Sequence, residues 1–204
     1  IPPKLRAGKS DYPEKVEQII QLATAGDVRD IILISTSAVY AGLEGVVNEE
    51  DSIVETDEKV KLIAQAERLV LNFSAQSKVI RAAGLIDKQR HPGRFFINGR
   101  ILKQPQEPVN LVHKTDISNI VALLSVATTE SKIFNVASNT HASKEIFYSL
   151  ATTCYNNETI NIEASHEHIA NRIITSEKVR TELNYQFVYD DLVEWLKRGT
   201  NEAI

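Results

Sequence analysis

Two hydroxyl side chains stand where an apolar run ends, a place where parallel α/β proteins often hold ligands. Ile31–Ile34 is short, wholly apolar and mostly β-branched, which is typical of a strand buried on both faces. Ser35 and Thr36 follow this run, and ligands of open parallel sheets bind at the carboxyl ends of strands. We therefore expect both hydroxyl groups to face a cleft. Taken alone, the pattern is equally consistent with residues that merely end a strand.

A basic segment further along the chain could bind an anion. Guanidinium groups bind phosphate through forked, charge-assisted hydrogen bonds, which favours a ligand that carries a diphosphate. The alternative interpretation is a solvated charged loop, since many charge runs only cover a surface. The basic residues of this segment are Lys88, Arg90, His91, Arg94, Arg100 and Lys103.

The other reactive side chains indicate less chemistry. His113 follows an apolar run and is consistent with either a cleft residue or a hydrogen-bonded structural histidine. His166 and His168 have His-x-His spacing without a cysteine or suitable carboxylate nearby, so we expect no metal site. Cys154 is expected to be a small buried hydrophobic side chain.

These residues must be positioned by elements in which apolar runs alternate with helical periodicity. Such alternation is typical of α/β units on a largely parallel sheet. Asp11-Tyr-Pro-Glu14 has capping-box spacing at the first helix, and the segment 84–108, rich in proline and glycine, is expected to be mostly loop. Helices are predicted near 11–23, 56–73, 115–127, 144–153, 177–183 and 190–197, and strands near 31–34, 79–82, 109–112, 133–136 and 159–162.

Composition restricts the class of protein. The 204 residues are 43% hydrophobic, enough for one good core, and the net charge of -4 argues against a nucleic-acid-binding protein. Apolar runs are too short to span a membrane, no signal peptide is evident, and a single cysteine fits a reducing compartment, so we expect a cytoplasmic protein. The chain begins at Ile1 and has no methionine, from which we expect an N-terminally incomplete sequence.

Several short motifs occur in an order that resembles one family. The run from Ser35 to Tyr40 is similar to the strand end of extended short-chain dehydrogenase/reductases, the NAD-dependent epimerase/dehydratase superfamily, although the glycine after the tyrosine is displaced to Gly42. Within that family it most resembles atypical, nucleoside-diphosphate-sugar epimerase-like members. Asn184 stands where a glycine is usual. The resemblance extends over nearly the whole chain through Ile1–Pro3, Arg81–Leu85, Arg90–Arg94, Val109–Asp116, Phe134–Val136 and Ser176–Tyr185.

The resemblance implies a fold and a set of sites. It implies an α/β protein with the C-terminal part of a Rossmann-like doubly wound parallel sheet and a small mixed α/β substrate lobe. Residues 1–84 would form the nucleotide-binding part and residues 85–204 the substrate-side lobe, with one compact unit as the alternative. NAD or NADP is the implied cofactor, a nucleotide sugar the implied small-molecule substrate, and a homodimer the implied assembly. The implied residues are Thr36 for catalysis, Pro2, Ser35, Arg81, Ala83 and Gly84 for the cofactor, and Tyr40, Arg90, His91, Arg94, Asn110 and His113 for the substrate.

Two departures from the family limit what the resemblance implies. The dinucleotide fingerprint needs closely spaced glycines so that the backbone can approach a pyrophosphate, and none of the eight glycines forms such a triplet. The family's Tyr-x-x-x-Lys pair, in which lysine lowers the pKa of the tyrosine, is also absent. Alignment on Glu67 places Lys59 and Ile63 at those two positions.

Three functions remain compatible with the sequence. The first is an NAD(P)-dependent oxidoreductase or epimerase in which Thr36 orients the substrate and another group replaces the tyrosine. The second is a non-catalytic dinucleotide-binding sensor or scaffold that kept the fold and lost the chemistry. The third is an α/β domain that binds no nucleotide.

Overall fold

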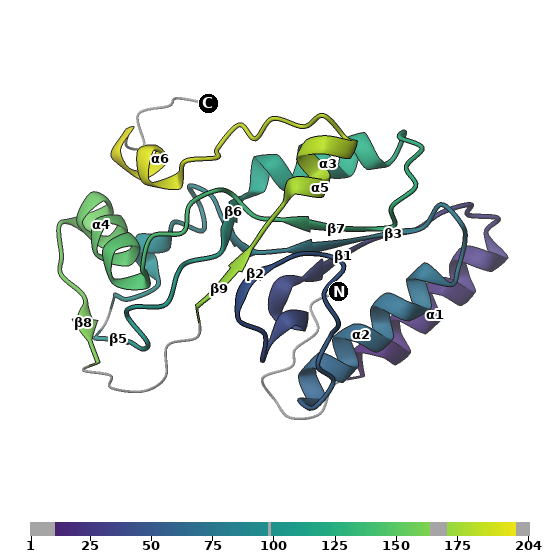
Figure 1. Ribbon diagram of the computed structural model, residues 1–204, viewed down its shortest axis with the longest axis horizontal. Helices are drawn as coiled ribbons and strands as arrows, with labels where there is room; N and C mark the ends of the chain where they lie inside the picture. The colour runs from purple at the N-terminus through teal and green to yellow at the C-terminus, as the bar shows by residue number, and fades with distance from the viewer. Residues whose placement is uncertain (1–10, 98, 164–170, 199–204) are drawn as a thin grey trace.

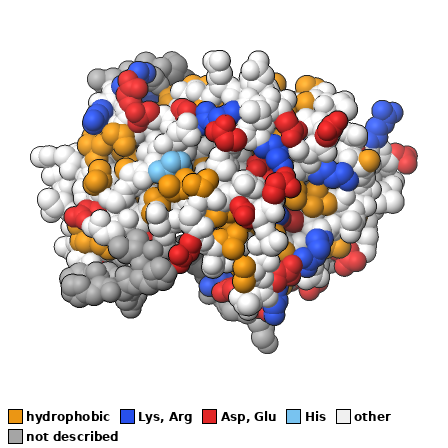
Figure 2. Space-filling view, viewed as in Figure 1, with side chains coloured by type: hydrophobic (Ala, Val, Ile, Leu, Met, Phe, Trp, Pro, Cys, Tyr) orange, Lys and Arg blue, Asp and Glu red, His pale blue; other side chains and the backbone are white. Residues whose placement is uncertain are grey.

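The computed structural model describes residues 11–97, 99–163 and 171–198. Pro2, His166 and His168 therefore lie outside the described residues, and the predictions for them stay predictions. No helix within the described ranges is long and apolar enough to cross a membrane. Acidic and basic side chains are interspersed over the face shown in Figure 2, in keeping with the small net charge.

A parallel sheet of three strands forms the centre of the fold. Strands β1 (Ile32–Thr36), β3 (Lys78–Ala82) and β7 (Ile133–Val136) lie in the order β1-β3-β7, with Ile80 of the middle strand opposite Ile34 and Phe134. All five residues of β3 are buried. The predicted strands near 31–34, 79–82 and 133–136 are therefore confirmed, and their carboxyl ends lie at one edge.

Helices cover both faces of this sheet. Helices α1 (Tyr12–Ala25) and α2 (Glu58–Leu71) pack together on one side, while α3 (Lys114–Leu124) and α5 (Glu177–Glu182) lie on the other (Figure 1). The largest apolar cluster joins these layers and includes Ile63, Ile80, Ile120 and Phe134. This is the expected doubly wound, Rossmann-like α/β class.

Side chains cap the N-termini of α2 and α3 but not those of α1 and α5. Asp57 accepts a hydrogen bond from the Lys59 amide at the start of α2, as expected of an N-cap. Asp11 makes no side-chain cap bond, so the predicted capping box is wrong; its carboxylate instead pairs with Lys15 at 2.7 Å.

Sequence patterns predicted only part of three further ladders, since the strands predicted near 109–112 and 159–162 correspond to one strand in each of two of them. They are all parallel, and each strand has only two or three residues, too few to show a period-2 pattern. Two of the strands lie within 84–108, so that segment is less irregular than expected. The ladders pair β2 (Gly45–Val47) with β9 (Arg172–Ile174), β4 (Gly84–Ile86) with β6 (Leu111–His113), and β5 (Ile101–Leu102) with β8 (Asn161–Ile162).

A second apolar cluster lies beside the sheet. It joins α4 (Lys144–Asn156), α6 (Leu192–Arg198) and the 3₁₀ helix η3 (Pro92–Arg94). Gly93 allows η3 to approach α4, because a Cβ at this position would lie 2.3 Å from the carbonyl oxygen of Ala151. The side chains of this cluster include Ile86, Phe147, Leu192 and Leu196.

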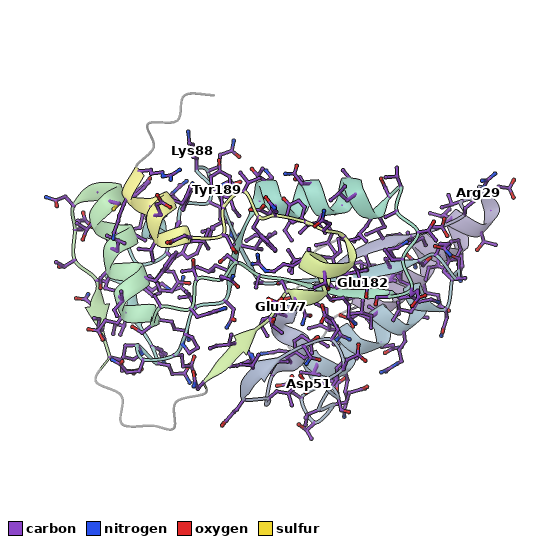
Figure 3. The ribbon with its side chains drawn as sticks, turned by 45° about the horizontal axis from the view of Figure 1, so that its top comes forward. Arg29, Asp51, Lys88, Glu177, Glu182 and Tyr189 are labelled. Carbon is purple, nitrogen blue, oxygen red and sulfur yellow. The ribbon has the colours of Figure 1, made fainter. Side chains whose placement is uncertain are left out.

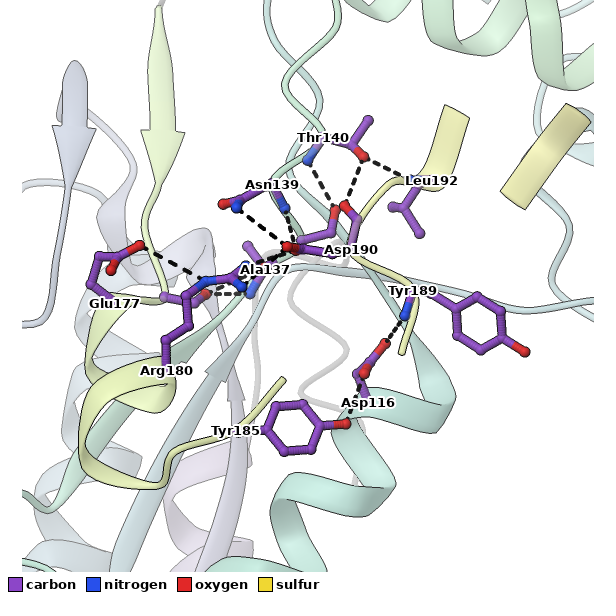
Figure 4. A network of polar contacts seen from close by, with 12 residues as sticks. Asp116, Ala137, Asn139, Thr140, Glu177, Arg180, Tyr185, Tyr189, Asp190 and Leu192 are labelled. Carbon is purple, nitrogen blue, oxygen red and sulfur yellow. Dashed lines mark hydrogen bonds and ion pairs between the residues drawn. The ribbon is translucent and has the colours of Figure 1, made fainter. Parts of the chain in front are cut away.

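A polar network ties the C-terminal segment to the main sheet (Figure 4). The fully buried carboxylate of Asp116 in α3 accepts hydrogen bonds from the Tyr185 hydroxyl at 2.7 Å and from two backbone amides, those of Val188 and Tyr189. Asn184, where a glycine is usual, has φ +47°, a left-handed conformation that asparagine tolerates better than most residues. The chain can therefore turn after α5 and place Tyr185 over α3.

Candidate functional site

A cavity of about 520 Å³ opens at the carboxyl ends of β1 and β3. It lies at the edge of a parallel sheet where α/β proteins bind ligands. Its wall draws on segments far apart in sequence, including Thr36, Gly84, Asn110, Lys144, Tyr148 and Arg172. We call this the Thr36 cavity.

Thr36 presents a hydrogen-bond donor to the cavity. Its Oγ1 accepts a hydrogen bond of 3.2 Å from the amide of Ala38, where the 3₁₀ helix η2 (Ser37–Tyr40) begins. That bond uses a lone pair and leaves the hydroxyl proton available. The hydroxyl can thus donate to a carbonyl, hydroxyl or phosphate oxygen of a ligand.

Ser35 faces the opposite way. Successive side chains of a strand alternate between its two faces, so Ser35 and Thr36 cannot both face one cavity. The Ser35 side chain is buried, and its hydroxyl donates to Oε1 of Glu67 at 2.5 Å. The expectation that both hydroxyls face the cleft is therefore wrong for Ser35.

Arg81 and Tyr40 also lie in packed protein. The Arg81 guanidinium donates to Oε2 of Glu67 at 2.8 and 3.0 Å and to the Tyr40 hydroxyl at 2.7 Å, and that hydroxyl donates to Asn135. Tyr40 has no exposed surface, and burial raises the pKa of its hydroxyl. Neither side chain lines the Thr36 cavity, and their predicted contacts with cofactor or substrate stay predictions.

The predicted substrate residues do not meet in one place. Asn110 lines the Thr36 cavity, but its amide is engaged by the backbone of β9, donating to the Arg172 carbonyl and accepting from the Ile174 amide, each at 2.8 Å. Of the predicted cofactor residues, Gly84 lines the cavity, whereas Ala83 is buried in the main core.

The basic loop lies beyond the other end of the β4–β6 ladder. Arg90, His91 and Arg94 line a separate pocket of about 430 Å³ beside Ile86, whereas the Thr36 cavity meets the same ladder at Gly84. Lys88 lies near Tyr189 at a third hollow (Figure 3). The structure therefore does not bring the basic loop to Thr36.

His113 is a buried residue that helps to close the second apolar cluster. Its ring lies 4.0 Å from the ring of Tyr189 and 5.3 Å from that of Trp195, and its Nδ1 accepts from the Thr115 amide at the start of α3. This is the structural alternative left open by the sequence. Cys154, expected to be buried, is exposed.

Three of the cavity residues that sequence reasoning missed are Lys144, Tyr148 and Arg172. Lys144 and Tyr148 stand one turn apart on α4 and both line the Thr36 cavity. Their order, Lys-x-x-x-Tyr, is the reverse of the pair that the family uses. Burial raises the pKa of the Tyr148 phenol, which suits a proton donor better than a base. Arg172 is the third, and its strand was not predicted.

The two family positions on α2 carry no equivalent chemistry. Lys59 is exposed and Ile63 lies in the main core with 1% of its surface accessible. Within the described residues, no group of three or more histidine, cysteine, aspartate or glutamate side chains could hold a metal ion.

The described residues do not fit the pyrophosphate of a dinucleotide. A pyrophosphate site needs a glycine-rich turn before a helix N-terminus that is free of negative charge. The helices next to β1 begin instead with carboxylates, Asp11 before α1 and Asp57–Glu58 at α2. The described residues thus offer no such site beside β1.

Comparison with known proteins supports this assignment of the fold. No protein-family model matches the chain. Protein YeeZ of Escherichia coli strain K12 is 28% identical over 192 residues, which cover 93% of this chain and 70% of that protein. YeeZ of Escherichia coli O157:H7 matches equally well.

Solved structures agree over a similar span. MoeE5 in complex with UDP-glucuronic acid and NAD has a TM-score of 0.76 at 15% identity, over 95% of this chain and 74% of that one. UDP-N-acetylglucosamine 4-epimerase from Bacillus cereus has a TM-score of 0.70 at 16% identity, over 95% and 72%. A functionally unknown conserved protein from Silicibacter pomeroyi has a TM-score of 0.73 at 18% identity, over 93% and 71%. The chain has the Rossmann-like fold of epimerase and dehydratase structures, as the resemblance implied.

Proposed function

We propose that this protein is an NAD(P)-dependent oxidoreductase or epimerase that acts on a nucleotide-sugar-like substrate, and that the described residues form the substrate side of its site. The observation that carries the proposal is the Thr36 hydroxyl, which ends a parallel strand at the wall of a cavity of about 520 Å³. Structures of the same fold include MoeE5 with UDP-glucuronic acid and NAD and an epimerase of UDP-N-acetylglucosamine.

In this proposal two side chains hold the substrate oxygen at the reacting carbon. Thr36 donates its free hydroxyl proton, and the Tyr148 phenol, kept protonated by burial, is a second donor on the facing helix. NAD or NADP, when bound, supplies the oxidation and reduction. The described residues form no pyrophosphate cradle, and Gly84 is a predicted cofactor residue that lines the cavity.

A non-catalytic sensor or scaffold is the second candidate. Exposed Lys59 and buried Ile63 favour it, because these positions no longer offer a proton-transfer group. For either candidate we also propose a cytoplasmic location, a homodimeric assembly and a boundary at residue 84 between a nucleotide-binding part and a substrate-side lobe.

Binding and turnover separate the two candidates. The natural protein is mixed with NAD, NADH or NADPH in a calorimeter and then assayed with a panel of sugar nucleotides. Net oxidation or reduction is followed by the absorbance of the reduced cofactor, and epimerisation, which leaves the cofactor unchanged, by chromatography of the sugar nucleotides. Turnover that falls about 100-fold in Thr36→Val and largely survives in Thr36→Ser supports catalysis, since a lost transition-state hydrogen-bond donor costs roughly this much.

The remaining outcomes are equally informative. Cofactor binding without turnover on any sugar nucleotide supports the sensor. Turnover that is indifferent to Thr36→Val contradicts the role of Thr36. An absence of cofactor binding favours an α/β domain that binds no dinucleotide.

A further inference from the structure

Arg172 reaches the Thr36 cavity from a strand distant in sequence. It is the first residue of β9, opposite Gly45 of β2, and its guanidinium donates to the Tyr40 carbonyl at 2.8 Å. The same side chain lines the cavity alongside Thr36 and Gly42. The guanidinium is therefore fixed against η2, one of the walls of the cavity.

The hydrogen-bonding capacity of this guanidinium is only partly used. Its Nε is buried and has no hydrogen-bond partner within the described ranges. No carboxylate of the described residues forms an ion pair with Arg172, whereas Arg81 pairs with Glu67 and Arg180 pairs with Asp190. A buried donor on a cation is costly to leave unpaired, so such a group favours an incoming anion.

The other charges of the cavity compensate each other. Lys144 forms an ion pair with Glu107, and both line the Thr36 cavity. Burial lowers the pKa of Arg172, although the negative charge of Glu107 opposes this shift. Arg172 is thus the cationic side chain of this wall without a carboxylate partner in the part of the chain that the structure describes.

The cavity wall that includes Arg172 also has open space at Gly42. Gly42 has φ +91°, and a Cβ at that position would meet no atom within 4 Å. The Thr36 hydroxyl on the same wall adds a neutral donor. A guanidinium, a hydroxyl and unfilled space together form a receptor for oxygen anions.

We propose that Arg172 binds a phosphate or carboxylate group of the ligand whose reacting end lies at Thr36. The inference rests on the proposed function for the identity of the ligand, and it assigns the anion to Arg172 rather than to the basic loop. Arg90 and Arg94 line a different pocket, and their guanidinium groups lie against Phe95 and the Gln89 carbonyl respectively.

Calorimetric titration with UDP, pyrophosphate and uncharged uridine tests the assignment. Arg172→Gln is expected to weaken UDP and pyrophosphate binding about 10- to 100-fold, as for loss of a hydrogen bond to a charged group. Any affinity for uridine should be unchanged. The matched control, Arg90→Gln, removes a cation from the other pocket and should leave UDP affinity within about twofold, because exposed charges contribute little.

A second variant guards against misfolding. Arg172→Gln also loses the hydrogen bond to the Tyr40 carbonyl, so its thermal unfolding is measured first. Arg172→Lys keeps the charge without the fork and should bind UDP with intermediate affinity and unchanged salt dependence. If the Gln variant does not fold, an Arg172→Lys variant with wild-type affinity for both anions overturns the proposal.

Three other results would also overturn it: no UDP or pyrophosphate binding by the wild type, wild-type affinity in folded Arg172→Gln, or loss of UDP binding in Arg90→Gln instead. Failure of the proposed function looks different. Anion binding that depends on Arg172, without turnover, leaves this inference standing and removes catalysis.

Discussion

At the scale of single residues, the end of β1 places one hydroxyl in packed protein and the next one at the Thr36 cavity. Ser35 and Thr36 are neighbours of similar chemistry, yet one donates to buried Glu67 and the other lines the Thr36 cavity. The alternation of side chains along a strand enforces this division.

Replacing the Ser35 hydroxyl by an apolar group should therefore change mainly the stability of the protein, and replacing the Thr36 hydroxyl should change mainly its affinity for the ligand. Ser35→Ala is expected to lower the free energy of unfolding by about 1–3 kcal/mol, because it removes a hydrogen bond to a buried carboxylate, and to leave UDP affinity unchanged. Thr36→Val should weaken UDP binding with a smaller loss of stability. Urea denaturation and calorimetry on both variants check this. A Ser35→Ala protein of normal stability but impaired UDP binding would reverse the assignment.

We expect the buried ion pair between Arg81 and Glu67 to be important for the stability of the fold. Both side chains are at most 4% exposed. Arg81→Leu leaves a buried carboxylate without its cation and should cost about 3–5 kcal/mol in the free energy of unfolding. The double variant Arg81→Leu, Glu67→Leu should lose less than the sum of the two single variants, since no buried charge remains. Additive losses in denaturation experiments would contradict this coupling.

At the scale of elements, the carboxylate of Asp116 joins α3 to the segment between α5 and α6 (Figure 4). Burial, followed by the hydrogen bond to Asp116, raises the pKa of Tyr185 from 10.0 to about 12. The folded protein thus holds this phenol proton more tightly than the unfolded chain does.

Because the pKa of Tyr185 is higher in the folded protein than in the unfolded chain, the stability of the protein falls as the pH rises through this range. The contribution of Tyr185 is fully present below pH 10 and is lost as the pH rises through about 12. The free energy of unfolding of the wild type should therefore fall more steeply over this range than that of Tyr185→Phe. Urea denaturation across a pH series checks the difference, and equal slopes for the two proteins would contradict it.

Sequence patterns located the long elements well and the short ones poorly. The apolar run at 133–136 and the Ser143 cap of α4 were read correctly because each signal is local. Strands such as β2 and β9 exist only because they pair with each other across more than a hundred residues, and no local pattern records that partner.

The same reason explains what could be predicted of the site. Thr36 was found from its own neighbourhood, the end of an apolar strand. Arg172 was not found because its strand, β9, was not predicted. Lys144 and Tyr148 were not found because their order on the helix, Lys-x-x-x-Tyr, is the reverse of the family's pair. Arg90 and Arg94 were assigned by their charge and by a short motif of the family, and neither says which pocket a side chain lines.

At the scale of the whole molecule, the structure has two apolar clusters of different size. The main cluster includes residues from both sides of position 84, such as Ile80 and Val112, while the second cluster lies under α4 and α6. Residues that follow position 84 therefore form a second, smaller core beside the one that contains the central sheet.

Hydrogen exchange should reveal this difference in stability. Amides of β3, which is hydrogen-bonded on both sides and buried throughout, are expected to exchange most slowly. Amides of α4 and α6 should exchange faster, through a partial opening that leaves β3 protected. Mass spectrometry of peptic fragments measures both, and equal protection of β3 and α6 would show one cooperative unit instead.

All the strand ladders formed by the described residues are parallel, and this has a consequence for how the chain reaches its native state. A parallel pair cannot be closed by a tight turn, so Ile34 meets Ile80 and Val46 meets Ile173 only after long stretches of backbone have been gathered. Such high contact order slows folding, because the entropy of closing each loop is lost before the contacts form. Apolar strands thus stay uncovered for longer on a nascent chain, which makes dilute conditions or a chaperone important for its yield.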